Sequence, residues 1–172
     1  MLKKIMLAGL ITLWALGGAS GAHALIKPGA TLPPLKLPDA QGATVDLAAL
    51  TKGKVAILVY WSVSCPHCRR DMPQLIELNQ QMSGNPFVML MINNDGPAMA
   101  QAAVNYAKQY QLPGPVIIDS GPGDSMPLGE AWDVVATPTV LVLDPKGKLV
   151  HAQEVQVDMN QIKNALDKAF GM

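Results

Sequence analysis

The chain has 172 residues, which is enough for one domain that folds around a core without a network of disulfides. Its 13 Lys and Arg residues balance 13 Asp and Glu residues, so it lacks the basic excess of a nucleic-acid-binding protein. Only two cysteines are present, which excludes a disulfide-scaffold toxin and a four-cysteine zinc site.

Residues 1–24 have the pattern of an export signal. Two lysines precede an apolar run, and Ala22-His23-Ala24 supplies the small residues of a cleavage site. The alternative is an uncleaved membrane anchor through residues 5–22. In both cases the lysines stay in the cytoplasm and the rest of the chain crosses the membrane. We therefore expect residues 25–172 to form a periplasmic domain, in a compartment where cysteine pairs can stay oxidised.

Strands and helices are expected to alternate along this domain. Continuous β-branched and aliphatic runs predict strands buried on both faces, and apolar residues at helical spacing predict the helices. A short hairpin around the turn residues 39–42 comes first. The predicted strands are then 54–61, 87–92, 116–118, 139–143 and 148–157, and the predicted helices are 65–82, 97–111, 128–132 and 158–170. This order predicts one α/β domain with a mixed central sheet flanked by helices and an N-terminal β-hairpin extension.

Cysteine chemistry is predicted at Cys65-Pro66-His67-Cys68, which follows the first buried strand and opens a helix. Two cysteines at this spacing lie on one face of the helix and can close a disulfide. At the N-cap, the Cys65 sulfur points toward unpaired backbone N–H groups and the positive end of the helix dipole. Pro66 suits the first helical position, and a protonated His67 adds a cation near the same sulfur. All of these effects favour the thiolate.

The size of that preference separates a reactive pair from a structural one. An ordinary cysteine has a pKa near 8.5 and is only about 3% ionised at pH 7. Lowering the pKa by ~2–4 units makes the thiolate dominant and corresponds to ~3–5 kcal/mol. The alternative is a structural staple, but so short a loop adds only about 2 kcal/mol to stability. We therefore predict a redox-active pair.

The chain resembles the thioredoxin superfamily, specifically its exported TlpA/ResA-type branch, over nearly all of residues 28–170. The matching features are the strand that ends at Tyr60-Trp61, the Cys65–Cys68 pair, Pro73 in the helix, Ala136-Thr137-Pro138-Thr139 before a strand, and the turn Asp144-Pro145-Lys146-Gly147. The resemblance implies a thioredoxin-like fold. It also implies that Cys65 is the exposed nucleophile and Cys68 the buried resolving thiol.

Further roles come from the same resemblance. Pro138 is similar to the family's cis-proline, beside which the partner peptide binds. The expected substrate-binding residues are Thr137, Pro138, Pro66 and Trp61. Asp71 matches an acidic residue of this branch and is expected to accept a proton from Cys68. Its alternative is a solvated helix charge, which is also the role expected for Arg69 and Arg70.

The resemblance leaves the direction of electron flow open. The scaffold matches the reductants of the TlpA/ResA branch, whereas Pro66-His67 matches the periplasmic oxidant DsbA. We expect a periplasmic thiol–disulfide oxidoreductase without a cofactor or a metal. Its partners would be cysteine-containing periplasmic proteins and a membrane or periplasmic redox protein. Two alternatives remain: a copper-handling protein that uses both cysteines and a histidine such as His151, and a thiol peroxidase.

Overall fold

The computed structural model describes residues 27–172, so the predicted export signal and its membrane-anchor alternative lie outside the described residues. Within 27–172, none of the helices has the length and apolarity needed to span a membrane. The strands are β1 (Lys36–Pro38), β2 (Thr44–Asp46), β3 (Val55–Trp61), β4 (Phe87–Asn93), β5 (Val116–Ile118), β6 (Thr139–Leu143) and β7 (Leu149–Glu154). The helices are α1 (Leu47–Thr51), α2 (Pro66–Gln81), α3 (Ala100–Tyr110), α4 (Pro127–Ala131) and α5 (Met159–Phe170), with 3-10 turns η1 (Pro97–Met99) and η2 (Pro122–Asp124).

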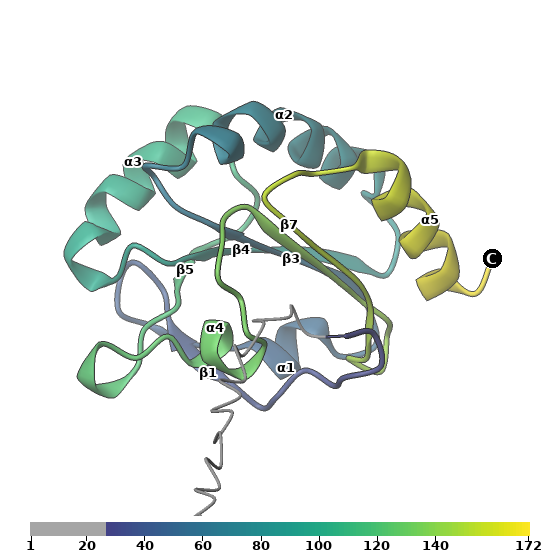
Figure 1. Cartoon of the computed structure of the whole chain (residues 1–172), viewed down its shortest axis with the longest axis horizontal. Coiled ribbons are helices and arrows are strands. Elements are labelled where there is room, and N and C mark those ends of the chain that lie inside the picture. The colour runs from purple at the N-terminus through teal and green to yellow at the C-terminus, as the bar shows by residue number, and fades with distance from the viewer. Residues whose placement is uncertain (1–26) are drawn as a thin grey trace, which may run out of the picture.

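The central sheet has five strands in the order β5-β4-β3-β6-β7, and β1 and β2 form a separate antiparallel hairpin. Strands β3, β4 and β5 are parallel, whereas β6 runs antiparallel to β3 and β7 antiparallel to β6. Helices α2, α3 and α5 cover one face of the sheet, and α1, α4 and the hairpin cover the other (Figure 1). The predicted thioredoxin-like α/β fold with a mixed sheet is confirmed.

Two hydrophobic cores sit on the two faces of β3, because successive side chains of a strand point in opposite directions. One set of alternate residues (Val55, Ile57, Val59 and Trp61) packs under α2, α3 and α5. The other set (Ala56, Leu58 and Tyr60) packs against the hairpin and α4. Every residue of β3 is buried, which explains its unbroken apolar sequence.

Three local predictions differ from the structure. Helix α1 was not expected; the Asp46 side chain caps it by accepting the Ala49 N–H at 3.0 Å. The predicted helix 97–111 begins as the 3-10 turn η1, so the α-helix starts only at Ala100 and Met99 is 42% exposed. Strand β7 ends at Glu154 rather than at residue 157, because Val155 has a φ of +67°.

The register of the central strands brings distant segments to one edge of the sheet. Tyr60 pairs with Thr139, so the end of β3 lies beside the start of β6. Thr139 in turn pairs with Glu154 at the end of β7. The cysteine segment after β3, the loop before β6 and the turn after β7 therefore meet at this edge.

Candidate active site

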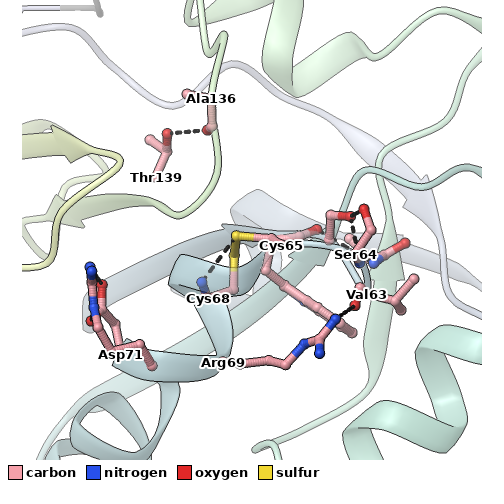
Figure 2. Close-up of a disulfide and its surroundings, with 12 residues drawn as sticks. Val63, Ser64, Cys65, Cys68, Arg69, Asp71, Ala136 and Thr139 are labelled. Carbon is pink, nitrogen blue, oxygen red and sulfur yellow. Dashed lines mark hydrogen bonds and ion pairs between the residues drawn. A yellow bond between two sulfur atoms is a disulfide. The ribbon is translucent and has the colours of Figure 1, made fainter.

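Cys65 and Cys68 form a disulfide at the start of α2, with their Cα atoms 5.3 Å apart. Cys65 is the N-cap, and its Sγ accepts the backbone N–H of Cys68 at 3.0 Å. Pro66 occupies the first turn, as predicted. Cys65 is 7% exposed and Cys68 only 1%. The helix end therefore presents the Cys68 N–H to the sulfur of Cys65, the more exposed of the two residues (Figure 2).

A carboxylate from the end of β4 fixes the loop before Cys65. Asp95 Oδ1 accepts the Ser62 hydroxyl at 2.5 Å, and Asp95 Oδ2 accepts the Val63 N–H at 2.8 Å. The Asn93 side chain donates to the same Oδ2 at 2.7 Å. Through these three bonds, the strand next to β3 sets the course of the chain into the N-cap. Sequence reasoning did not identify Asp95, Ser62 or Asn93.

Asp71 is buried one helical turn after Cys68, and only 3% of it is exposed. The Arg70 guanidinium donates to both of its oxygens, at 2.6 and 2.9 Å. The same hydrogen bond raises the pKa of Arg70. Arg69 reaches the other way and donates to the Val63 carbonyl at 3.3 Å (Figure 2). Both arginines are exposed, as expected for solvated helix charges, and each also donates to a defined acceptor.

The segment from Ala136 to Thr139 lies across from the disulfide (Figure 2). The peptide bond between Thr137 and Pro138 is cis. Thr137 is half-buried and Pro138 is buried. The Thr139 hydroxyl donates to the Ala136 carbonyl at 2.7 Å, which closes the loop on itself. The structure thus brings this predicted segment to the cysteine pair.

The other predicted site residues have different environments. Pro66 and His67 are exposed beside the disulfide. Trp61 is completely buried; its ring lies 4.9 Å from that of Tyr106, between centroids. The indole of Trp61 lies in the core because β3 continues through residue 61 and keeps its alternation. Substrate contact by Trp61 stays a prediction.

A second buried carboxylate supports the opposite face of the sheet at the same edge. Asp119 Oδ2 accepts the Tyr60 hydroxyl at 2.6 Å and the Gly129 N–H at 2.9 Å. Asp119 Oδ1 accepts the Leu128 N–H at 3.0 Å. The pKa of Tyr60 is raised, chiefly because its hydroxyl is buried and also because it lies beside the Asp119 carboxylate. This arrangement anchors the first turn of α4 to β3.

The copper alternative finds no site in the described part of the chain. Among residues 27–172, no three His, Cys, Asp or Glu side chains converge in a way that would hold a metal ion. His151 lies on β7, where its Nε2 atom is buried without a hydrogen-bond partner among those residues. The prediction that His151 joins the two cysteines is therefore wrong.

A comparison with known protein families shows to which family this chain belongs. Its residues 27–168 match the model of the family described as Redoxin. The chain belongs to the Redoxin family. Thiol-disulfide oxidoreductase ResA of Bacillus cereus is 27% identical over 177 aligned residues, which cover 98% of each chain. The ResA protein of Bacillus subtilis is 28% identical over 73% of this chain and 66% of its own length.

Solved structures share the fold. The thioredoxin domain of a thiol-disulfide oxidoreductase from Bacteroides vulgatus superposes with a TM-score of 0.69 at 20% identity, over 83% of this chain and 97% of that one. A thioredoxin-family thiol:disulfide interchange protein from Chlorobium tepidum superposes with a TM-score of 0.67 at 20% identity, over 85% and 99% of the two chains. The Redoxin match and the two ResA relatives confirm the resemblance to ResA-type proteins noted in the sequence.

Proposed function

We propose that this protein is a thiol–disulfide oxidoreductase of the ResA type that works outside the cytoplasm on cysteine-containing proteins. The observation that carries the proposal is the disulfide at the N-terminus of α2, where Cys65 Sγ accepts the Cys68 N–H. An N–H donor and a helix dipole stabilise negative charge on that sulfur. The ResA relatives carry the name of the same activity.

The reaction needs only the two cysteines and the partner. In the reduced protein, the Cys65 thiolate attacks a partner disulfide, forms a mixed disulfide and releases one partner sulfur as a thiolate. The Cys68 thiolate then attacks Cys65 Sγ and expels the second partner sulfur. Two electrons pass to the partner, and the Cys65–Cys68 disulfide is left in the protein. Run in reverse, the same steps oxidise a partner dithiol.

The surrounding residues divide between docking and proton transfer. Thr137, Pro138 and exposed Pro66 frame the approach of a partner peptide to Cys65. Asp71 serves Cys68: its carboxylate takes up the thiol proton before the resolving attack. The bidentate bond from Arg70 holds that carboxylate in place. Residues 1–24 supply the export signal.

Covalent trapping in the periplasm tests the proposal. A Cys68→Ser variant cannot resolve the mixed disulfide, so partner proteins should stay attached to Cys65 and separate only on reduction. A Cys65→Ser variant is the matched control and should trap none. Equal trapping by both variants, or by neither, would contradict the assignment. The dominant redox form of the wild-type pair in the same cells gives the direction: a reduced pair identifies a reductant and a disulfide an oxidant.

Ionisation of Cys65 provides an independent test in vitro. The rate of alkylation of the reduced protein, measured against pH, should inflect well below the pKa of about 8.5 of free cysteine. An inflection at the free-cysteine value would show that the helix end does not activate this sulfur.

A further inference from the structure

The turn that follows β7 has a backbone conformation that its sequence does not favour. The Gln156 N–H donates to the Glu154 carbonyl at 2.7 Å, so the chain reverses over three residues. Val155 at the centre of this γ-turn has a φ of +67°. Positive φ is unfavourable for β-branched residues, and such strained turns concentrate at functional sites. The turn lies at the edge of the sheet that carries the disulfide, as the pairing of Glu154 with Thr139 shows.

The first two residues of this turn, Glu154 and Val155, hold the loop around Pro138. The Val155 N–H donates to the Pro138 carbonyl at 2.8 Å. Glu154 Oε1 accepts the Val135 N–H at 3.1 Å and lies 3.1 Å from the Thr139 hydroxyl oxygen. The bond from Val155 continues the β6–β7 pairing by one residue beyond Thr139 and Glu154, and the γ-turn ends the strand directly after it.

These contacts act on the backbone that faces a docked partner. The carboxylate of Glu154 contacts Val135 and Thr139, and the N–H of Val155 binds the Pro138 carbonyl. These positions lie on both sides of Thr137. Glu154 itself is only half-buried, so it does not serve the hydrophobic core. A carboxylate that accepts a backbone N–H forms a stronger hydrogen bond than a neutral acceptor.

We propose that Glu154 is a positioning residue for partner docking: its carboxylate, together with the Val155 γ-turn, holds the Pro138 loop in the shape that receives an extended protein segment. The inference rests on the proposed oxidoreductase function and adds a distinction between substrates. Protein disulfides need the loop because they bind along it. Small disulfides reach Cys65 without it. Loss of Glu154 should therefore discriminate between the two classes.

Steady-state kinetics with two substrates tests this. Insulin serves as the protein disulfide and hydroxyethyl disulfide as the small one, with dithiothreitol as the electron source. Glu154→Ala should lower kcat/KM for insulin about ten-fold, mostly through KM, the size expected for loss of one charge-assisted hydrogen bond. The rate with hydroxyethyl disulfide should change less than about two-fold. Glu154→Gln keeps an oxygen for the Val135 N–H and should recover most of the insulin activity; it also serves if the alanine variant does not fold.

Glu130→Ala is the matched control, because Glu130 also accepts a backbone N–H, that of Met126 at 3.1 Å, but at α4. It should leave both substrates unchanged. An equal loss on both substrates in Glu154→Ala, or no loss on insulin, would overturn the inference while leaving the oxidoreductase function intact. A wild-type protein that reduces neither substrate and does not oxidise a reduced protein dithiol either would instead refute the proposed function.

Discussion

Replacing Asp95 with Asn removes one charge and exchanges one acceptor for a donor at the loop before the disulfide. In the native protein, Oδ1 accepts the Ser62 hydroxyl, and Oδ2 accepts the Val63 N–H and an Asn93 side-chain N–H. The asparagine keeps all three partners when its oxygen takes the place of Oδ2, where it accepts from Val63 and Asn93. Its NH₂ group then donates to the Ser62 hydroxyl, which can turn its own proton to Ser64 Oγ. What is lost is the negative charge on the acceptor.

The expected cost follows from the lost charge on the acceptor. A hydrogen bond to a charged group contributes about 1.5–3 kcal/mol and a neutral one about 0.5–1.5 kcal/mol, so three bonds at this partly buried site lose about 1–3 kcal/mol together. Native domains have only about 5–15 kcal/mol of stability in total. For a urea m-value of about 2 kcal/mol/M, the unfolding midpoint should fall by roughly 0.5–1.5 M.

Urea unfolding followed by tryptophan fluorescence measures this shift, in the oxidised and the reduced protein separately. Asp124→Asn is the matched control: Asp124 is exposed, and its φ of +59° is one that asparagine tolerates. The control loses the same charge and should keep its midpoint. A shift in Asp95→Asn no larger than in Asp124→Asn would refute the reasoning, because the effect would then come from net charge and not from the hydrogen bonds.

Three further outcomes are expected. Gly129→Ala places a Cβ atom 2.8 Å from the Tyr60 hydroxyl oxygen. Such overpacking should lower the free energy of unfolding by about 1–3 kcal/mol, measured by thermal unfolding. An unchanged Tm would contradict this. Tyr60→Phe removes the hydroxyl that donates to Asp119. The free energy of unfolding in urea should fall by about 1–3 kcal/mol, and the alkylation rate of Cys65 should stay unchanged. Burial lowers the pKa of His151, so the unfolded state binds the proton more readily and stability should fall as pH drops through about 6.5; His151→Gln should flatten that slope.

The sequence predicted best those elements that depend only on residues close together in the chain. The buried strands appear as unbroken apolar runs, and β3, β4 and β6 lie where expected. Cys65 caps α2 with Pro66 in the first turn, because capping depends on residues within one helical turn. The last helix is likewise capped by Asp158, whose side chain accepts the N–H groups of Asn160 and Gln161. Each of these features is complete within a few residues.

The groups that hold the site together could not be predicted in the same way. Ser62 and Asp95 are 33 residues apart, and Tyr60 and Asp119 are 59 apart. A polar run after a buried strand, Asn93-Asn94-Asp95, was a weak signal, because the carboxyl ends of parallel strands meet at one sheet edge. Which loop donor such a carboxylate meets depends on strand order, which no local pattern contains.

The sequence by itself therefore determined the cysteine pair, the helix that Cys65 caps and the class of fold. Tertiary structure alone decided that Trp61 faces the core, that Asp95 holds the loop before Cys65, and that Glu154 reaches the Pro138 loop. The physical reason is that periodicity and capping act over one or two turns of chain. Contacts between strands depend on register, which forms only when the sheet assembles.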